Sequence, residues 1–136
     1  MTRLSTFAVA GVLLLGGQAP GLAQTAAPHV YFVEPADGAS VTSPFKVKFG
    51  LDNYALKPAG DASPESGHHH LIVDGAPPKM GEVIGAGETS LHFGKAQTET
   101  TLSLPPGRHK LTLQLGDGAH VSLGPQFSST IEVEVR

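Results

Sequence analysis

Residues 67–75 contain three consecutive histidines, His68, His69 and His70, followed by an apolar run. An apolar run of this length with glycines at both ends predicts a short, buried β-strand. Side chains of a strand alternate between its two faces, so His68 and His70 share one face and His69 lies on the other. Two imidazoles about 7 Å apart along one face can bind a common metal ion or anion. Further ligands must come from other elements of the chain.

The composition restricts the metal ligands to histidine and carboxylate. The 136 residues include seven histidines and twelve acidic residues but no cysteine. No disulfide can form, and no thiolate can bind a metal ion. The formal net charge is −3, and removing an amino-terminal segment that carries only Arg3 makes it −4. A mildly acidic domain lacks the basic surface that nucleic acid or an anionic membrane requires, so neither is an expected partner.

Residues 1–23 have the pattern of a secretory signal peptide. A basic start with Arg3 precedes an apolar run at residues 4–17, and small residues lead to Ala23, after which cleavage is expected. An uncleaved membrane anchor is the alternative interpretation, but the apolar run is too short to span a bilayer comfortably. We therefore expect a periplasmic or secreted protein without a membrane span once the signal is removed. Its parts are a short polar lead at 24–28 and one domain at 29–136.

Hydrophobic alternation predicts an all-β domain. In residues 44–51, Phe45, Val47, Phe49 and Leu51 alternate with other residues, as in a strand with one buried face. Turns rich in proline and glycine separate similar segments along the chain. This pattern is typical of a single immunoglobulin-like antiparallel β-sandwich of about seven strands. The predicted strands span residues 29–34, 44–51, 67–74, 82–84 (a weak edge strand), 97–104, 108–115 and 127–135.

The topology of such a sandwich predicts where the histidines lie, because consecutive connections fall at alternate ends. His29 opens the first strand, the triple histidine begins the third, and His92 precedes the fifth. Asp117 and His120 lie in the turn before the last strand. All these positions share one end of the sandwich, although they are scattered along the sequence.

His109 is expected at the opposite end. It follows the turn at residues 104–107, a position that often holds the tyrosine of a tyrosine corner in β-sandwiches. A buried polar ring needs a hydrogen-bond partner. We therefore expect a structural histidine whose ring nitrogen bonds the backbone of that turn.

Several candidate residues also have a structural interpretation. His69 shares its face with Leu71, so we expect it to cap the core and leave the other two histidines of the triplet exposed. The opposite phase, with Ile72 facing the core, would exchange the inward and outward histidines. Asp117 can be a turn residue that bonds its own backbone, a metal ligand, or a group that orients a neighbouring histidine.

Six segments carry a resemblance to a known family. They are residues 29–38, 44–49, 67–71, 92–99, 104–107 and 115–120. Together they resemble the bacterial domain-of-unknown-function family 4399 over nearly the whole chain after the signal sequence. This family implies no established activity.

A weaker similarity links the chain to the CopC-type periplasmic copper-binding β-sandwiches. The shared features are an opening histidine, a Pro-Ala-Asp-Gly-Ala turn at 35–39, and a late turn containing aspartate and histidine. In that family these histidines and the aspartate bind copper, which implies His29, Asp117 and His120 here. The chain departs from the pattern in two ways. His29 is not the amino terminus after the expected cleavage, and Ala119 is an additional residue in the turn.

We expect a non-enzymatic, exported binding domain that holds copper or zinc at its histidine-rich end. Imidazole-rich sites without thiolates suit these ions, and relative affinity favours copper. Because only neutral imidazole binds a metal, affinity is expected to fall below pH about 6.5. The expected ligands are His68, His70 and His120, with Asp117 and His92 as further ligands or orienting groups and His29 and His69 as weaker candidates.

Two other classes of function remain open. A metal-free module can bind another exported protein or a glycan through the histidines and the long loop at 52–66. A hydrolase can use an Asp117–His120 pair with Ser66 or Ser122 as the nucleophile, but no motif specific to such enzymes surrounds either serine.

Overall fold

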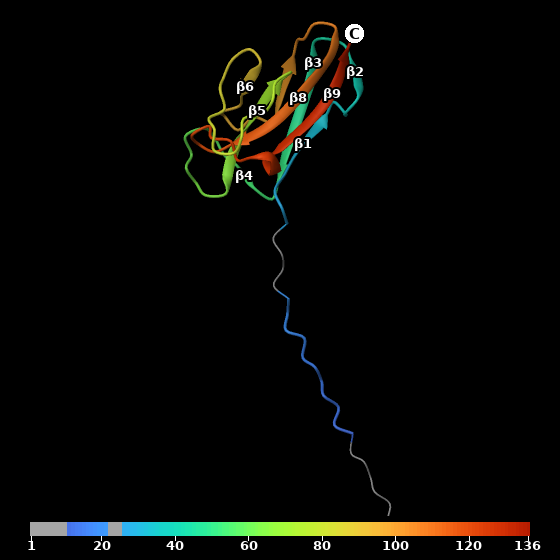
Figure 1. Ribbon diagram of the computed structural model, residues 1–136, viewed down its shortest axis with the longest axis vertical. Coiled ribbons are helices and arrows are strands. Elements are labelled where there is room, and N and C mark those ends of the chain that lie inside the picture. The colour runs from blue at the N-terminus through green and yellow to red at the C-terminus, as the bar shows by residue number, and fades with distance from the viewer. Residues whose placement is uncertain (1–10, 22–25) are drawn as a thin grey trace, which may run out of the picture.

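The computed structural model describes residues 11–21 and 26–136, and its described part is all-β (Figure 1). Residues 11–21 form no helix or strand, and no helix among the described residues is long and apolar enough to be a membrane span. Residues 1–10 and the expected cleavage site after Ala23 lie outside the described residues. The elements are β1 (His29–Glu34), β2 (Ala39–Val41), β3 (Phe45–Asp52), β4 (Ala55–Leu56), β5 (Ser66–Val73), β6 (Ser90–His92), β7 (Glu99–Leu102), β8 (Gly107–Gly116), the 3-10 turn η1 (Pro125–Phe127) and β9 (Ser128–Val135).

The strands form two sheets (Figure 1). The smaller sheet has the order β1-β3-β7, and the larger has the order β2-β9-β8-β5-β4, with β6 also paired to β5. The predicted all-β class is confirmed. The long strands pair antiparallel as predicted, whereas the short strands β2 and β4 pair in parallel with β9 and β5. These two strands are also additional to the predicted set. Each has only two or three residues, too few for a hydrophobic alternation to be recognised.

One hydrophobic core lies between the two sheets. Val47 and Phe49 of β3 supply it from the smaller sheet, and Leu71 of β5 with Leu111 and Leu113 of β8 supply it from the larger. The leucines are fully buried. Burying a side chain of this size contributes about 1.5–3 kcal/mol, so these alternating positions hold β5 and β8 rigidly against β3. The outer face of β5 and β8 is thereby also fixed.

The predicted edge strand near residues 82–84 is not a strand in the structure. Val83 forms only an isolated bridge with Val121. The edge strand beside β5 is β6 instead, which pairs with residues 70–72. Residues 82–84 follow two prolines, Pro77 and Pro78, and are flanked by glycines. Prolines and glycines prevent a continuous ladder of hydrogen bonds here.

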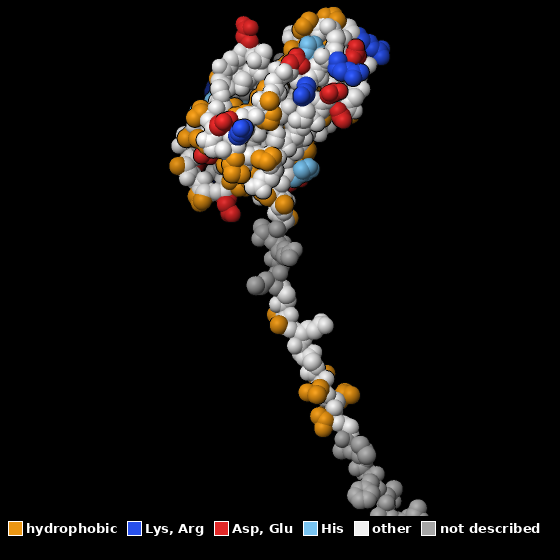
Figure 2. Space-filling view, in the orientation of Figure 1, with side chains coloured by type: hydrophobic (Ala, Val, Ile, Leu, Met, Phe, Trp, Pro, Cys, Tyr) orange, Lys and Arg blue, Asp and Glu red, His pale blue; other side chains and the backbone are white. Residues whose placement is uncertain are grey.

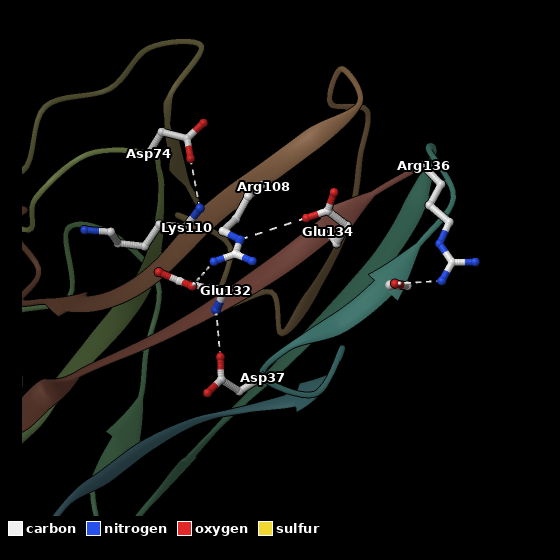
Figure 3. Close-up of polar contacts among 8 residues, drawn as sticks. Asp37, Asp74, Arg108, Lys110, Glu132, Glu134 and Arg136 are labelled. Atoms are coloured by element: carbon white, nitrogen blue, oxygen red, sulfur yellow. Dashed lines mark hydrogen bonds and ion pairs between the residues drawn. The ribbon is translucent and has the colours of Figure 1, made fainter.

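Charged side chains of both signs intermix on the face of the domain shown in Figure 2. Arg108 lies 3.9 Å from Glu132 and 3.9 Å from Glu134 across β8 and β9 (Figure 3). All three side chains are at least half exposed to solvent. Exposed ion pairs contribute about 0–1 kcal/mol each, so these pairs within the larger sheet add little to the stability that the core provides.

The structural role predicted for His109 is confirmed. Its Nε2 lies 2.8 Å from the carbonyl oxygen of Pro105, and its Nδ1 lies 2.7 Å from Oδ2 of Asp74. Both partners only accept hydrogen bonds, so both ring nitrogens carry a proton and the ring is an imidazolium. The bond to Asp74, followed by the bond to Pro105, raises the pKa of His109. Asp74 also accepts a hydrogen bond from the Lys110 amide (Figure 3). The charged ring therefore ties β8 to the end of β5.

Asp74→Asn is expected to lower the free energy of unfolding by about 1 kcal/mol at acidic pH. The pKa of His109 is higher in the folded than in the unfolded protein, so its contribution is complete below pH about 6.5 and is lost as the pH rises through the folded-state value. Urea unfolding of parent and variant across this range measures the difference. Asp37→Asn is the control, because Asp37 likewise accepts a backbone hydrogen bond, from Glu132, without a histidine. A difference that does not change with pH would contradict the assignment.

Candidate metal centre

Strand β5 separates the three consecutive histidines as its alternation requires. His69 is buried on the core side, where its ring packs edge-on against Phe49 with 4.8 Å between the centroids. His68 and His70 lie on the opposite, outer face. The predicted phase, with Leu71 inward, is therefore confirmed.

The expectation that His68 and His70 are exposed is wrong. Their exposed fractions are 0% and 1%. The loop that joins β5 to β6 covers them, because the Ile84 amide donates to the His120 carbonyl at 2.8 Å and the Ser122 amide donates to the Glu82 carbonyl at 2.8 Å. These backbone bonds attach the loop to the turn after β8, and the outer face of β5 becomes an interior.

Two further histidines reach the same place from other elements. His92 lies opposite His70 in the antiparallel pair of β5 and β6, and directly opposed residues share a face of the sheet. His120 lies in the turn that follows β8, with a left-handed backbone at φ 63°. Its amide donates to the Asp117 carbonyl at 2.9 Å, which holds the turn closed. Three segments distant in sequence thus direct four histidines to one point.

The four imidazoles form a compact cluster. One ring nitrogen of each of His68, His70, His92 and His120 lies within 4.8 Å of the other three. The Nε2 atom of His68 is central, at 3.1 Å from Nδ1 of His120 and 3.1 Å from Nε2 of His92. A tetrahedral ion with bonds of about 2.0–2.1 Å separates its ligand nitrogens by about 3.3 Å. These two distances are close to the spacing that one shared ion imposes, and the remaining nitrogens lie within 4.8 Å of one another.

Hydrogen bonds within the cluster do not satisfy all its nitrogens. Neither ring nitrogen of His70 has a hydrogen-bond partner, and Nδ1 of His68 has none. A neutral imidazole always carries one N–H donor and one lone pair, and leaving such a group buried and unpaired costs about 1–3 kcal/mol. A metal ion that accepts the lone pair of each imidazole would offset part of this cost. The donor set thus fits a transition metal ion.

The surroundings keep these histidines neutral. Burial lowers the pKa of His70 to about 3, with further lowering by His68, His92 and His120. Burial, followed by His92 and His120, lowers the pKa of His68 to about 4. Burial and the neighbouring His120 also lower the pKa of His92. At pH 7 these three rings have free lone pairs, which is the form that binds a metal.

The structure does not bring the other predicted site residues into the cluster. His29 is exposed and stacks on Tyr31 with 5.0 Å between the ring centroids. Asp117 accepts hydrogen bonds from the amides of Ala119 and Val121 through Oδ1, both at 2.9 Å. Of the three roles considered for Asp117, it therefore has that of a turn residue that bonds its own backbone, and it shapes the loop that carries His120. The CopC-like set of His29, Asp117 and His120 is thus not assembled.

A pocket of about 130 Å³ lies against the cluster. Three of the four histidines line it, and its other walls are apolar. His92 is exposed and His120 is half-buried, so the cluster can be reached from solvent on this side. His68 does not line the pocket and closes the cluster from the side of the sheet. The lining residues are His70, Val83, Ile84, Ala86, His92 and His120.

Sequence reasoning missed the part played by Gly116. It lies opposite His68 on the neighbouring strand. A Cβ atom at this position would lie 2.9 Å from Cε1 of His70 and 2.9 Å from Cδ1 of Ile84. The missing side chain therefore leaves the room in which the His70 ring and the covering loop fit. A glycine beside a turn carries no signal that distinguishes this role from an ordinary turn.

Gly116→Ala is expected to destabilise the protein by about 1–3 kcal/mol, because the new methyl group overpacks a fully buried ring. Chemical denaturation measures the loss. Gly85→Ala is the matched control, since no atom lies within 4 Å of a Cβ built at Gly85. Equal stability of the two variants would show that the space beside His70 is not needed.

Comparison with known proteins identifies the family of the domain but no activity. The family model described as "Domain of unknown function (DUF4399)" matches residues 47–136, which include all four clustered histidines. No curated protein and no solved structure gives a match. The weaker similarity to CopC-type proteins therefore stays a prediction. Because the matched segment is more than half of the chain, this protein belongs to the DUF4399 family of domains of unknown function.

Proposed function

We propose that this protein is an exported domain that binds one divalent transition metal ion through His68, His70, His92 and His120. The observation that carries the proposal is that nitrogens from these four imidazoles lie within 4.8 Å of one another. The burial of His68 and His70 without enough hydrogen-bond partners supports it. Buried polar groups normally have hydrogen-bond partners, and a shared metal ion would supply one to these rings.

Copper and zinc are the proposed ions. The cluster offers nitrogen ligands only, and imidazole suits both Cu(II) and Zn(II). Relative affinity favours copper, whereas the 3.1 Å spacing around His68 is also compatible with tetrahedral zinc. The signal peptide pattern of residues 1–23 supports a periplasmic or secreted location for this binding.

We propose binding rather than catalysis. The hydroxyl of Ser66 donates to the Ser63 carbonyl at 2.7 Å, and that of Ser122 donates to the Pro78 carbonyl at 3.1 Å. Both serines that a hydrolase would need are therefore engaged with the backbone. This arrangement supports a binding role, because a nucleophilic serine needs an adjacent base to accept its proton.

A metal-free interaction module is the alternative function. A pocket of about 480 Å³ lies between the loop before β5 and the turn after β8, and Tyr54, Asp61, Glu65 and Asp117 are among its lining residues. Its size falls in the range of small-molecule and side-chain binding sites. This pocket favours the alternative only if the histidine cluster binds no metal.

Calorimetric titration of the purified protein, without a histidine tag, with Cu(II) and with Zn(II) tests the proposal. We expect the parent to bind one ion per chain. His92→Ala removes one of the four ligands and should lower the affinity by about 100-fold or more. His92 is exposed, so its truncation leaves the core intact. His29→Ala is the matched control, an exposed histidine outside the cluster, and should bind like the parent. No heat in the parent, or equal binding by His92→Ala, would contradict the proposal.

A further inference from the structure

The pocket beside the histidine cluster is built from two kinds of side chain. His70, His92 and His120 form one wall, and Val83, Ile84 and Ala86 of the covering loop form the other. The three apolar side chains contain no atom that can bind a metal. A fourth imidazole, His68, lies outside the pocket lining and bonds His92 and His120 from the side of the sheet. One wall of the pocket therefore supplies metal ligands, and the opposite wall supplies none.

The charges around the cluster are not balanced for a divalent ion. Four neutral imidazoles leave such an ion with its full charge of about +2. Asp117 is the carboxylate in the turn that carries His120. Its Oδ1 accepts hydrogen bonds from the amides of Ala119 and Val121, and the residue is not part of the cluster. An uncompensated charge in a largely buried site attracts an anion from outside.

The size of the pocket limits what that anion can be. The pocket has a volume of about 130 Å³. Sites for larger organic ligands have volumes of about 300–1,000 Å³. The pocket therefore favours an anion of a few atoms over a larger organic ligand.

We propose that a Cu(II) ion held by the four histidines takes a further ligand from the pocket side, and that this ligand is a small monoanion. The inference rests on the proposed function. It adds an anion as a further ligand of the metal ion and the side from which that anion binds. Val83, Ile84 and Ala86 favour an anion of a few atoms on this side. The pocket is the route by which solvent reaches the ion.

Azide binding to the Cu(II)-loaded protein tests the inference, because azide is a small monoanion whose bond to Cu(II) gives a new absorption band. We expect a saturable band in the parent. Ala86→Trp, which fills the pocket from its exposed wall, should keep one copper per chain and weaken azide binding by about tenfold or more. Ala62→Trp is the matched control at an exposed alanine that lines the other pocket, and it should bind azide like the parent.

The outcomes separate this inference from the proposed function. One copper per chain without a saturable azide band would overturn the inference and leave the metal site standing. Unchanged azide binding in Ala86→Trp would also overturn it, since the anion would then lie on another side. Should Ala86→Trp lose copper, Val83→Trp on the same wall replaces it, because Val83 is 69% exposed. Failure of the parent to bind copper would overturn the inference, and failure to bind Zn(II) as well would remove the proposed function itself.

Discussion

His70→Leu is expected to raise the free energy of unfolding of the metal-free protein by about 1–2 kcal/mol and to abolish its stabilisation by metal. Both ring nitrogens of His70 are buried without partners, and leucine has a similar volume but no polar atom to desolvate. In the parent, zinc at about 100 times its dissociation constant should add about 2.7 kcal/mol. Urea unfolding of parent and variant, with and without Zn(II), measures both effects.

His69→Leu is the matched control for this experiment. His69 lies in the same strand, is equally buried and also has two unpaired ring nitrogens, but it faces the core against Phe49. We expect a similar gain in metal-free stability with the zinc effect retained. Retention of the zinc effect in His70→Leu would mean that the outer face of β5 is not the binding site. A loss of stability in both variants would show that the unpaired nitrogens carry no cost.

Acidification is expected to destabilise the metal-free protein between pH about 6.5 and about 4. Burial lowers the pKa of His68 and His69 to about 4 and that of His70 to about 3. The unfolded chain therefore binds more protons than the folded protein in this interval, and stability falls as the pH falls. Each histidine contributes a slope on the order of 1 kcal/mol per pH unit. Urea unfolding at a series of pH values measures the total slope.

His70→Leu should flatten that slope, because it removes the histidine with the lowest pKa. The same shift changes the expected pH dependence of metal binding. Protons compete with the metal for His68 near pH about 4 and for His70 near pH about 3, so these two ligands should stay available well below the pH of about 6.5 expected for exposed histidines. Equal slopes in parent and variant would contradict the neutral, buried state of His70.

The sequence by itself determined the local features of this protein. A period of two in β5 separates His69 from His68 and His70, and the same period in β8 places Leu111 and Leu113 in the core. The turn at Asp117 was readable from its residue types, and so was the bond between His109 and the turn before β8. These features depend on neighbours within a few residues or on one strand face, which a local pattern contains.

Only the tertiary structure decided which of the candidate histidines come together. The loop before β6 has no hydrophobic period, yet its contacts with the turn after β8 bury His68 and His70. Strand β6 takes the place of the predicted edge strand near 82–84 and so brings His92 opposite His70. His29, predicted at the same end, lies on the smaller sheet and outside the cluster. Strand order and loop packing depend on contacts between distant segments, which no local pattern in one sequence encodes.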